Sequence, residues 1–290
     1  MKVSISSYSF HALTNDGKMS WADCIKWAKE AGADGFEIAG LGRDWDSDPL
    51  GYAQALKDEC DKVGLEITNY TVGGDFLNGT GGSPDNEAER LMGQVDIAHA
   101  IGAPGMRHDL TSGFSYGQRK YRGFDNILAQ LAEGCRTVAD YAAGKGIRTM
   151  VENHGFFSQD SDRLEKLVNA VAHENFGILC DMGNFLCVDE DPVQAVSRLA
   201  PYTFLAHAKD FHVKSGSAPS PGKGFFGTRG GNYLRGAIIG HGDVPVKQCL
   251  RILRNAGYNG YVSIEFEGME DPLKGIAIGL ENLRHYIGAL

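Results

Sequence analysis

The sequence has no long apolar run and no closely spaced cysteines. In 290 residues no stretch approaches the ~18 consecutive apolar residues of a membrane-spanning helix, so we expect no membrane partner. The six cysteines are scattered without a C-x-x-C pair, which favours reduced, mostly buried thiols over a disulfide framework. Met1 leads straight into strand-like residues, without the apolar region or cleavage pattern of a signal peptide. These absences predict a cytoplasmic protein.

Positive charge is also scarce. The formal net charge is -9 and the isoelectric point is near 5.5, whereas binding to nucleic acid depends on a basic surface that neutralises phosphates. We therefore expect no nucleic-acid partner. The first strand-like segment is not followed by G-x-G-x-x-G, so the sequence gives no support for a dinucleotide cofactor.

Strand-like apolar segments alternate with segments of helical periodicity along the chain. Helix starts are indicated where Ser83, Asp191 and Asp271 are each followed by proline, and Gly64 suits the end of a helix. The expected strands are 3–10, 35–39, 65–71, 104–109, 148–154, 176–181, 203–208 and 261–266. The expected helices are 21–31, 50–63, 84–101, 121–143, 160–173, 192–199, 246–256 and one beginning at 272.

Eight consecutive strand–helix units are typical of a closed (β/α)8 TIM barrel, which we expect to form a single domain over residues 1–290. An open doubly wound sheet is the alternative, although such sheets usually have fewer units. No change in composition marks a domain boundary.

Four of the expected strands end on a residue that can bind a metal. In a barrel the carboxyl ends of the strands meet at one mouth, so residues far apart in sequence become neighbours there. Three carboxylates and one imidazole suit a hard or borderline divalent ion such as Mn2+, Mg2+ or Co2+. Alternatively, each is a separate polar group satisfied at its own strand end. The four residues are Glu152, Asp181, His207 and Glu265.

The sequences around these four residues resemble those of a known family, the xylose-isomerase-like barrels, over essentially the whole chain. The family includes sugar-phosphate isomerases, ketose 3-epimerases, inosose isomerases and dehydratases, and endonuclease IV. The resemblance implies that the four residues are ligands of one divalent ion, with Mn2+ favoured and Mg2+, Co2+ or Zn2+ as alternatives. It also implies that Glu152 and Glu265 are the catalytic proton-transfer pair. The motifs are Val151-Glu152-Asn153-His154, Asp181-Met182-Gly183-Asn184, His207-Ala208-Lys209-Asp210 and Ile264-Glu265-Phe266-Glu267.

Asn184 departs from the family pattern. Many of the epimerases have a sugar-binding histidine at this position, and an amide can donate a hydrogen bond to a hydroxyl group but cannot transfer a proton. Endonuclease IV needs additional histidines, including one here, for its trinuclear site. This acidic chain lacks that set, so the resemblance does not extend to DNA repair.

The expected chemistry begins with removal of a proton beside a carbonyl group. A metal that binds the carbonyl and a neighbouring hydroxyl oxygen stabilises the enediolate that forms. Return of the proton gives epimerisation or aldose–ketose isomerisation, whereas loss of a β substituent gives elimination. Our first hypothesis is an isomerase or epimerase that acts on a small keto-sugar or its derivative. The alternative is a lyase, either an inosose-type dehydratase or a deglycosidase that acts on a 3-oxo-glycoside. A sugar-binding barrel that has lost catalysis is a third hypothesis.

Several further residues are candidates for substrate binding. His154 follows Glu152 by two positions and so has the same orientation in an extended segment, and His108 ends the fourth strand. Asn184 and His241 complete the set, with His241 as a candidate acid or base from the loop; a capping or packing role is the alternative for His154 and His108. Glu267 shares the inward orientation of Glu265 and would replace it as ligand if the register shifted by two.

The segment 211–242 is basic and rich in glycine, and contains no Asp or Glu. Irregular connections of this length are uncommon in compact domains and are often lids or binding loops. We expect a long loop after the seventh strand that either contacts the substrate or packs against a second subunit in a homo-oligomer. Its basic residues are Lys214, Lys223, Arg229 and Arg235.

Overall fold

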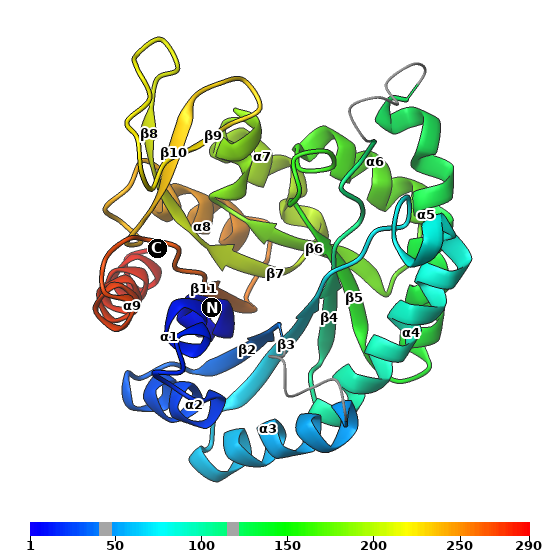
Figure 1. The fold of residues 1–290 in the computed structure, drawn as a ribbon, viewed down its shortest axis with the longest axis horizontal. Helices are drawn as coiled ribbons and strands as arrows, with labels where there is room; N and C mark the ends of the chain where they lie inside the picture. Colours follow the sequence, from blue (N-terminus) through cyan, green and yellow to red (C-terminus); the bar gives the residue numbers. More distant parts are fainter. Residues whose placement is uncertain (41–47, 115–121) are drawn as a thin grey trace.

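The computed structural model describes residues 1–40, 48–114 and 122–290, and its centre is a closed barrel of eight parallel strands (Figure 1). Around the ring the order is β1-β11-β7-β6-β5-β4-β3-β2, and pairing of β1 with β2 closes it. The predicted (β/α)8 fold is confirmed, because each strand pairs on both sides, whereas an open sheet would have two edge strands paired on one side only. The barrel strands are β1 (Lys2–Ser6), β2 (Gly35–Ala39), β3 (Glu66–Val72), β4 (Gly105–His108), β5 (Arg148–Glu152), β6 (Phe176–Asp181), β7 (Thr203–Ala208) and β11 (Tyr261–Ile264).

Helices surround the barrel (Figure 1). Ser83, Asp191 and Asp271 each accept a hydrogen bond from the backbone N–H three residues ahead, and a proline follows each of them, as the sequence predicts. Gly64 ends its helix with φ of 66°, a left-handed conformation that glycine adopts without strain. The helices are α1 (His11–Asn15), α2 (Trp21–Glu30), α3 (Pro49–Val63), α4 (Pro84–Ile101), α5 (Phe124–Ala143), α6 (Ser161–Val171), α7 (Pro192–Leu199), α8 (Val246–Asn255) and α9 (Pro272–Gly288).

The first strand is shorter than predicted. It ends at Ser6, and residues 7–10 form a turn of 3-10 helix instead of continuing the strand. The Ser7 hydroxyl donates to the carbonyl oxygen of Ala39 (3.0 Å) and accepts from its N–H (2.7 Å). These bonds replace strand pairing at the barrel edge. The predicted start of the fourth helix, Tyr121, lies outside the described residues.

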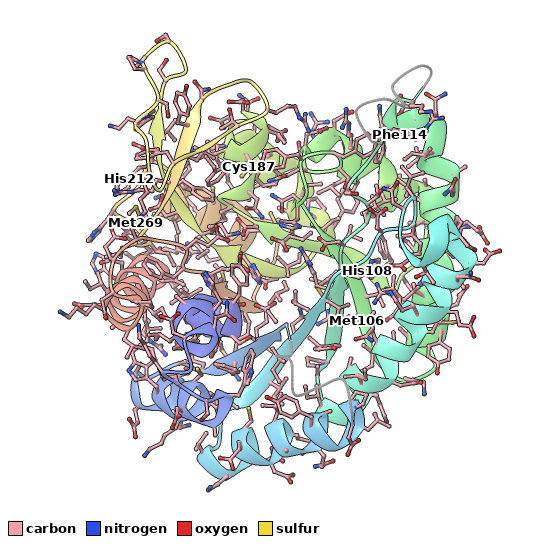
Figure 2. The ribbon with its side chains drawn as sticks, in the orientation of Figure 1. Met106, His108, Phe114, Cys187, His212 and Met269 are labelled. Atoms are coloured by element: carbon pink, nitrogen blue, oxygen red, sulfur yellow. The ribbon has the colours of Figure 1, made fainter. Side chains whose placement is uncertain are left out.

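The long connection after β7 is partly ordered rather than irregular. It contains β8 (Asp210–Lys214), β9 (Phe226–Gly227) and β10 (Tyr233–Ala237), which form a three-stranded antiparallel sheet that projects from the barrel at the upper left of Figure 1. Phe211 and Leu234 are buried against Cys187, which Figure 2 labels near the base of this sheet. These apolar residues stabilise the strands, while the glycines lie mainly in the turns between them.

The six cysteines are all free and buried, in agreement with their scattered apolar settings. Among the helices of the described residues, none combines the length and apolarity needed to cross a membrane.

Candidate metal centre and active site

The four predicted metal ligands meet at the mouth of the barrel. Glu152 ends β5 and Asp181 ends β6. His207 is the penultimate residue of β7, and Glu265 follows β11 directly. These four strands are consecutive neighbours in the ring. Each residue has one atom able to bind a metal, a carboxylate oxygen or an imidazole nitrogen, and these four atoms all lie within 4.8 Å of one another. All four residues are buried. We call these four residues the ligand cluster.

Two atoms of the ligand cluster form no hydrogen bond with the described part of the chain: Asp181 Oδ2 and His207 Nδ1. Asp181 Oδ1 accepts from the backbone N–H groups of Gly183 (2.8 Å) and Asn184 (2.9 Å), whereas Oδ2 has Lys209 Nζ at 3.3 Å as an ion-pair partner. Buried polar atoms are rarely left unsatisfied, and a carboxylate oxygen and an imidazole nitrogen are common metal-ligand atoms. A divalent ion would satisfy both, so the residues present fit a metal ion.

The side chain of Asn153 fixes the backbone at the end of β6. Its Nδ2 donates to the carbonyl oxygen of Asp181 (2.8 Å), and its Oδ1 accepts from the N–H of the same residue (2.9 Å). The amide therefore extends the pairing of β5 with β6 by one step and holds Asp181 in place.

Glu37, on β2, was not predicted as a site residue. Its Oε2 lies 2.7 Å from His207 Nε2, on the side of the imidazole ring opposite the ligand cluster. Glu37 is fully buried, and its other oxygen accepts from Asn69 Nδ2 (3.2 Å) and Thr71 Oγ1 (2.8 Å). The carboxylate therefore contacts His207 from inside the barrel.

Two buried cations lie beside the carboxylates. Lys209 Nζ is 2.5 Å from Glu265 Oε2, 3.3 Å from Asp181 Oδ2 and 3.2 Å from Glu267 Oε1. Arg107 Nη2 is 2.5 Å from Glu152 Oε2. Neither residue was predicted to act in the site, although Lys209 lies within one of the family motifs. The sequence did contain a signal for Arg107 and Glu37, because each is a charged residue within a strand-like, mainly apolar segment.

Burial and neighbouring charges shift the pKa values of the ligand cluster. Desolvation, with the charges of Glu152 and Glu265, raises the pKa of Asp181 to about 6 despite the opposing effect of Lys209. Desolvation also opposes ionisation of Glu265, but Lys209 and His207 outweigh it and hold its pKa well below the usual range. Burial disfavours the charged form of His207, yet Glu37 and Glu265 raise its pKa well above the usual value. Without a metal, His207 therefore holds a proton near neutral pH.

A cavity of about 440 Å3 opens beside the ligand cluster. Glu152 and Glu265 line it, as do both buried cations. The cavity is large enough for a small sugar and combines acceptors, donors and aromatic surface. Its lining residues are Tyr8, Ala39, Gly40, Tyr70, Thr71, Val72, Gly73, Arg90, Gln94, Arg107, Glu152, His154, Lys209, Glu265 and Glu267.

Two of the predicted substrate-binding residues lie in or beside this cavity. His154 lines it, and its Nδ1 is 2.8 Å from Asp109 Oδ1. Asn184 is buried beside the ligand cluster, where Nδ2 donates to Glu152 Oε1 (2.8 Å) and Oδ1 accepts from Lys209 (3.1 Å). Asn184 thus links a predicted ligand to a buried cation.

The other two lie elsewhere. His108, at the end of β4, is fully buried with its ring against the edge of Phe76, and it is not among the cavity-lining residues (Figure 2). Desolvation lowers its pKa to about 4, so the ring is neutral. His241 is exposed in the turn between β10 and α8 and does not line the cavity either. The structure thus places His108 in a packing position and His241 on the surface.

The basic residues of 211–242 are also separate from the cavity, since no residue of this segment lines it. Arg229 is paired with Asp160 (3.1 Å), and Arg235 lies 3.9 Å from Glu270. Glu267 lines the cavity beside Lys209, whereas Glu265 belongs to the ligand cluster.

Residues 25–286 match the family described as xylose isomerase-like TIM barrel, and the chain belongs to this family. An inosose dehydratase of Clostridium perfringens is 26% identical over 145 residues, 49% of this chain and 47% of that protein. The chain spans about half the length of the curated relatives it matches.

Solved structures share the fold along nearly the whole chain. The 3-keto-D-glucoside 4-epimerase from E. coli is 16% identical with a TM-score of 0.72, covering 98% of this chain and 99% of that chain. A xylose isomerase-like TIM barrel protein from Mycobacterium smegmatis, solved in complex with magnesium, is 16% identical with a TM-score of 0.70, covering 99% and 95%. At this identity the likeness concerns the fold alone.

Proposed function

We propose that the protein is a metal-dependent isomerase or epimerase that transfers a proton at the carbon beside the carbonyl group of a keto-sugar. The observation that carries the proposal is the ligand cluster, whose donor atoms lie within 4.8 Å of one another beside a cavity of about 440 Å3. Membership of a family with sugar-modifying relatives supports it.

The metal would be held by the ligand cluster. When bound, a divalent ion there polarises the substrate carbonyl and makes the neighbouring C–H more acidic. Three carboxylates and one imidazole suit Mn2+, which the family resemblance favours, and the magnesium complex of a structural neighbour supports Mg2+ as an alternative.

Glu152 and Glu265 would act as the proton-transfer pair. Both line the cavity, and each is fixed by a cation: Arg107 holds Glu152 at 2.5 Å and Lys209 holds Glu265 at 2.5 Å. Fixed carboxylates that face one cavity from β5 and from the end of β11 can remove a proton at one position and return it at another. The two cations would also stabilise negative charge that develops on the substrate oxygen.

The substrate we propose is uncharged rather than phosphorylated. Each cationic side chain that the structure places along the cavity already has a carboxylate partner. Arg90 pairs with Glu87 (2.7 Å) and His154 with Asp109 (2.8 Å), while Arg107 and Lys209 pair as described above. A phosphate would therefore have to displace a carboxylate from one of these cations. A neutral keto-sugar needs only hydrogen bonds.

A lyase is the second candidate, because the curated relatives are inosose dehydratases. Elimination begins with the same proton removal and then needs an acid for the departing hydroxyl group. His154, which Asp109 orients at the cavity wall, is the residue we would assign to that step.

The two outcomes are separable in deuterated buffer with keto-sugars, an inosose and 3-oxo-glycosides as substrates. Deuterium in an isomer or epimer supports the first proposal, whereas an unsaturated product supports the lyase. The matching sugar phosphates should react more poorly, and preferential turnover of a phosphate would contradict the proposed substrate class.

We expect Glu152→Gln to lower the rate of exchange of the substrate proton by at least about 100-fold, because the amide cannot accept the proton. Glu89→Gln makes the same charge change on an exposed residue of α4 and should leave exchange unaltered. Exchange in folded E152Q at the wild-type rate would refute the assignment.

A further inference from the structure

Glu37 lies inside the barrel, away from solvent and from the wall of helices. Its strand, β2, does not neighbour β7, so the contact with His207 crosses the barrel interior. The distance from Glu37 Oε2 to His207 Nε2 is 2.7 Å, and both side chains are at most 1% exposed. A buried carboxylate is costly unless its hydrogen bonds are satisfied.

The hydrogen bonds of Glu37 orient it toward one ring nitrogen. Asn69 Nδ2 and Thr71 Oγ1 both bond to Oε1, which leaves Oε2 facing His207. A carboxylate can only accept, so Nε2 must carry the hydrogen in this contact. The opposite nitrogen, Nδ1, lies 3.8 Å from Asp181 Oδ2 and 3.6 Å from Glu265 Oε2.

We propose that Glu37 is a positioning residue that keeps the hydrogen of His207 on Nε2 and directs the lone pair of Nδ1 into the ligand cluster. The inference rests on the proposed metal site. A neutral imidazole binds metal through the nitrogen that lacks a hydrogen, and the partner of the other nitrogen decides which one that is. Glu37 thus acts through His207 and touches neither metal nor substrate.

A merely structural role would require only that the two buried groups satisfy each other. It would not fix which nitrogen carries the hydrogen once metal is bound, nor couple position 37 to metal affinity. These two properties can be measured without substrate, so the test does not depend on which reaction the enzyme catalyses.

The isosteric variant Glu37→Gln tests metal affinity. Asn69 and Thr71 favour an oxygen at the Oε1 position, which turns the new amide nitrogen toward His207 Nε2 and favours hydrogen on Nδ1 instead. We expect Mn2+ affinity, measured by calorimetry, to fall by about 10- to 100-fold. Glu89→Gln is the matched control and should bind Mn2+ like the wild type.

Folded E37Q protein with wild-type Mn2+ affinity would overturn the positioning role while leaving the proposed function intact. Absence of Mn2+ binding by the wild type would overturn both proposals.

A second measurement uses the wild-type protein and remains decisive if E37Q does not fold. In the Zn2+-loaded protein, 15N NMR of the histidine rings should show His207 with hydrogen on Nε2 and none on Nδ1; the H207Q spectrum assigns the signals. Hydrogen on Nδ1, with Nε2 free, would contradict the inference.

Discussion

Replacement of Lys209 by methionine should destabilise the metal-free protein much more than the metal-loaded protein. The ammonium group is buried and lies within 3.3 Å of oxygens of Asp181, Glu265 and Glu267. Two of these oxygens, Asp181 Oδ2 and Glu265 Oε2, belong to the side chains of the ligand cluster. The lysine and a metal ion would therefore share the same negative charge.

The size of the effect follows from the cost of leaving buried carboxylates without their cation. Removal of one partner of a buried ion pair costs about 3–5 kcal/mol. For a chain of this size, at about 2 °C per kcal/mol, the melting temperature of metal-free K209M should fall by about 6–10 °C. If bound Mn2+ recovers about 2 kcal/mol of this loss, the variant binds Mn2+ about 30-fold more tightly than the wild type does.

Calorimetric melting in EDTA and in saturating Mn2+, with Mn2+ titrations of the folded proteins, measures both quantities. Lys214→Met removes an exposed lysine at the end of β8 and should change neither. Equal destabilisation of K209M in EDTA and in Mn2+, or weaker Mn2+ binding, would refute the reasoning. Either result would mean that Lys209 and the metal do not compete for the same oxygens.

Three other outcomes are expected. His207, with its pKa raised well above the usual value, is already protonated at pH 7 and must release its proton to bind Mn2+. Asp181, with its pKa raised to about 6, takes up a proton between pH 7 and pH 5. Mn2+ affinity should therefore decline over this range, and constant affinity would be inconsistent with these shifts. Asp210 accepts from four backbone N–H groups, two on each oxygen: Phe211 and Val244 on Oδ1, and Gly240 and Gly242 on Oδ2. Asp210→Asn turns an amide NH2 toward two of these donors and should cost about 3 kcal/mol in denaturant unfolding. Asp243→Asn should cost less, because its amide oxygen can still accept the one bond, from the N–H of Val213. A Cβ at Gly236 would lie 2.1 Å from the carbonyl oxygen of Glu267, so Gly236→Ala should lower the free energy of unfolding by about 1–3 kcal/mol. Gly227→Ala on β9, with open space around it, should lower it less, and equal effects would contradict the close approach at Gly236.

The fold and the ligand cluster were predictable because their signals are local. Ser83 with its proline and Gly64 mark helix ends through contacts with residues a few positions away. Glu152 and Asp181 each end an apolar run, and parallel strands bring such ends to one edge without any knowledge of side-chain packing. Their positions at the carboxyl ends of parallel strands were enough to predict that they meet.

The partners of the ligand cluster were not predictable in this way. Glu37 and His207 are 170 positions apart on strands that are not neighbours, and only the closed barrel brings them together. Arg107 could equally have paired at the surface. The sheet formed by β8, β9 and β10 was not predicted from the sequence because glycines dominate its turns, whereas its stability comes from packing on Cys187. His108 also lies at the carboxyl end of a strand, but its ring lies against Phe76 rather than in the cavity.

The balance of charge connects these unpredicted residues to the proposed chemistry. Five carboxylates surround the site, whereas Lys209 and Arg107 are the permanent cations that contact them in the described chain. The excess negative charge explains why the metal-free cluster keeps protons on His207 and, below about pH 6, on Asp181. Below about pH 6 a divalent ion would replace both protons without changing the local charge, whereas at neutral pH it would replace the proton of His207 alone and remove one unit of the excess negative charge. The site would then retain a small negative charge, which disfavours a phosphate group but not a neutral sugar. The carboxylates are Glu37, Glu152, Asp181, Glu265 and Glu267.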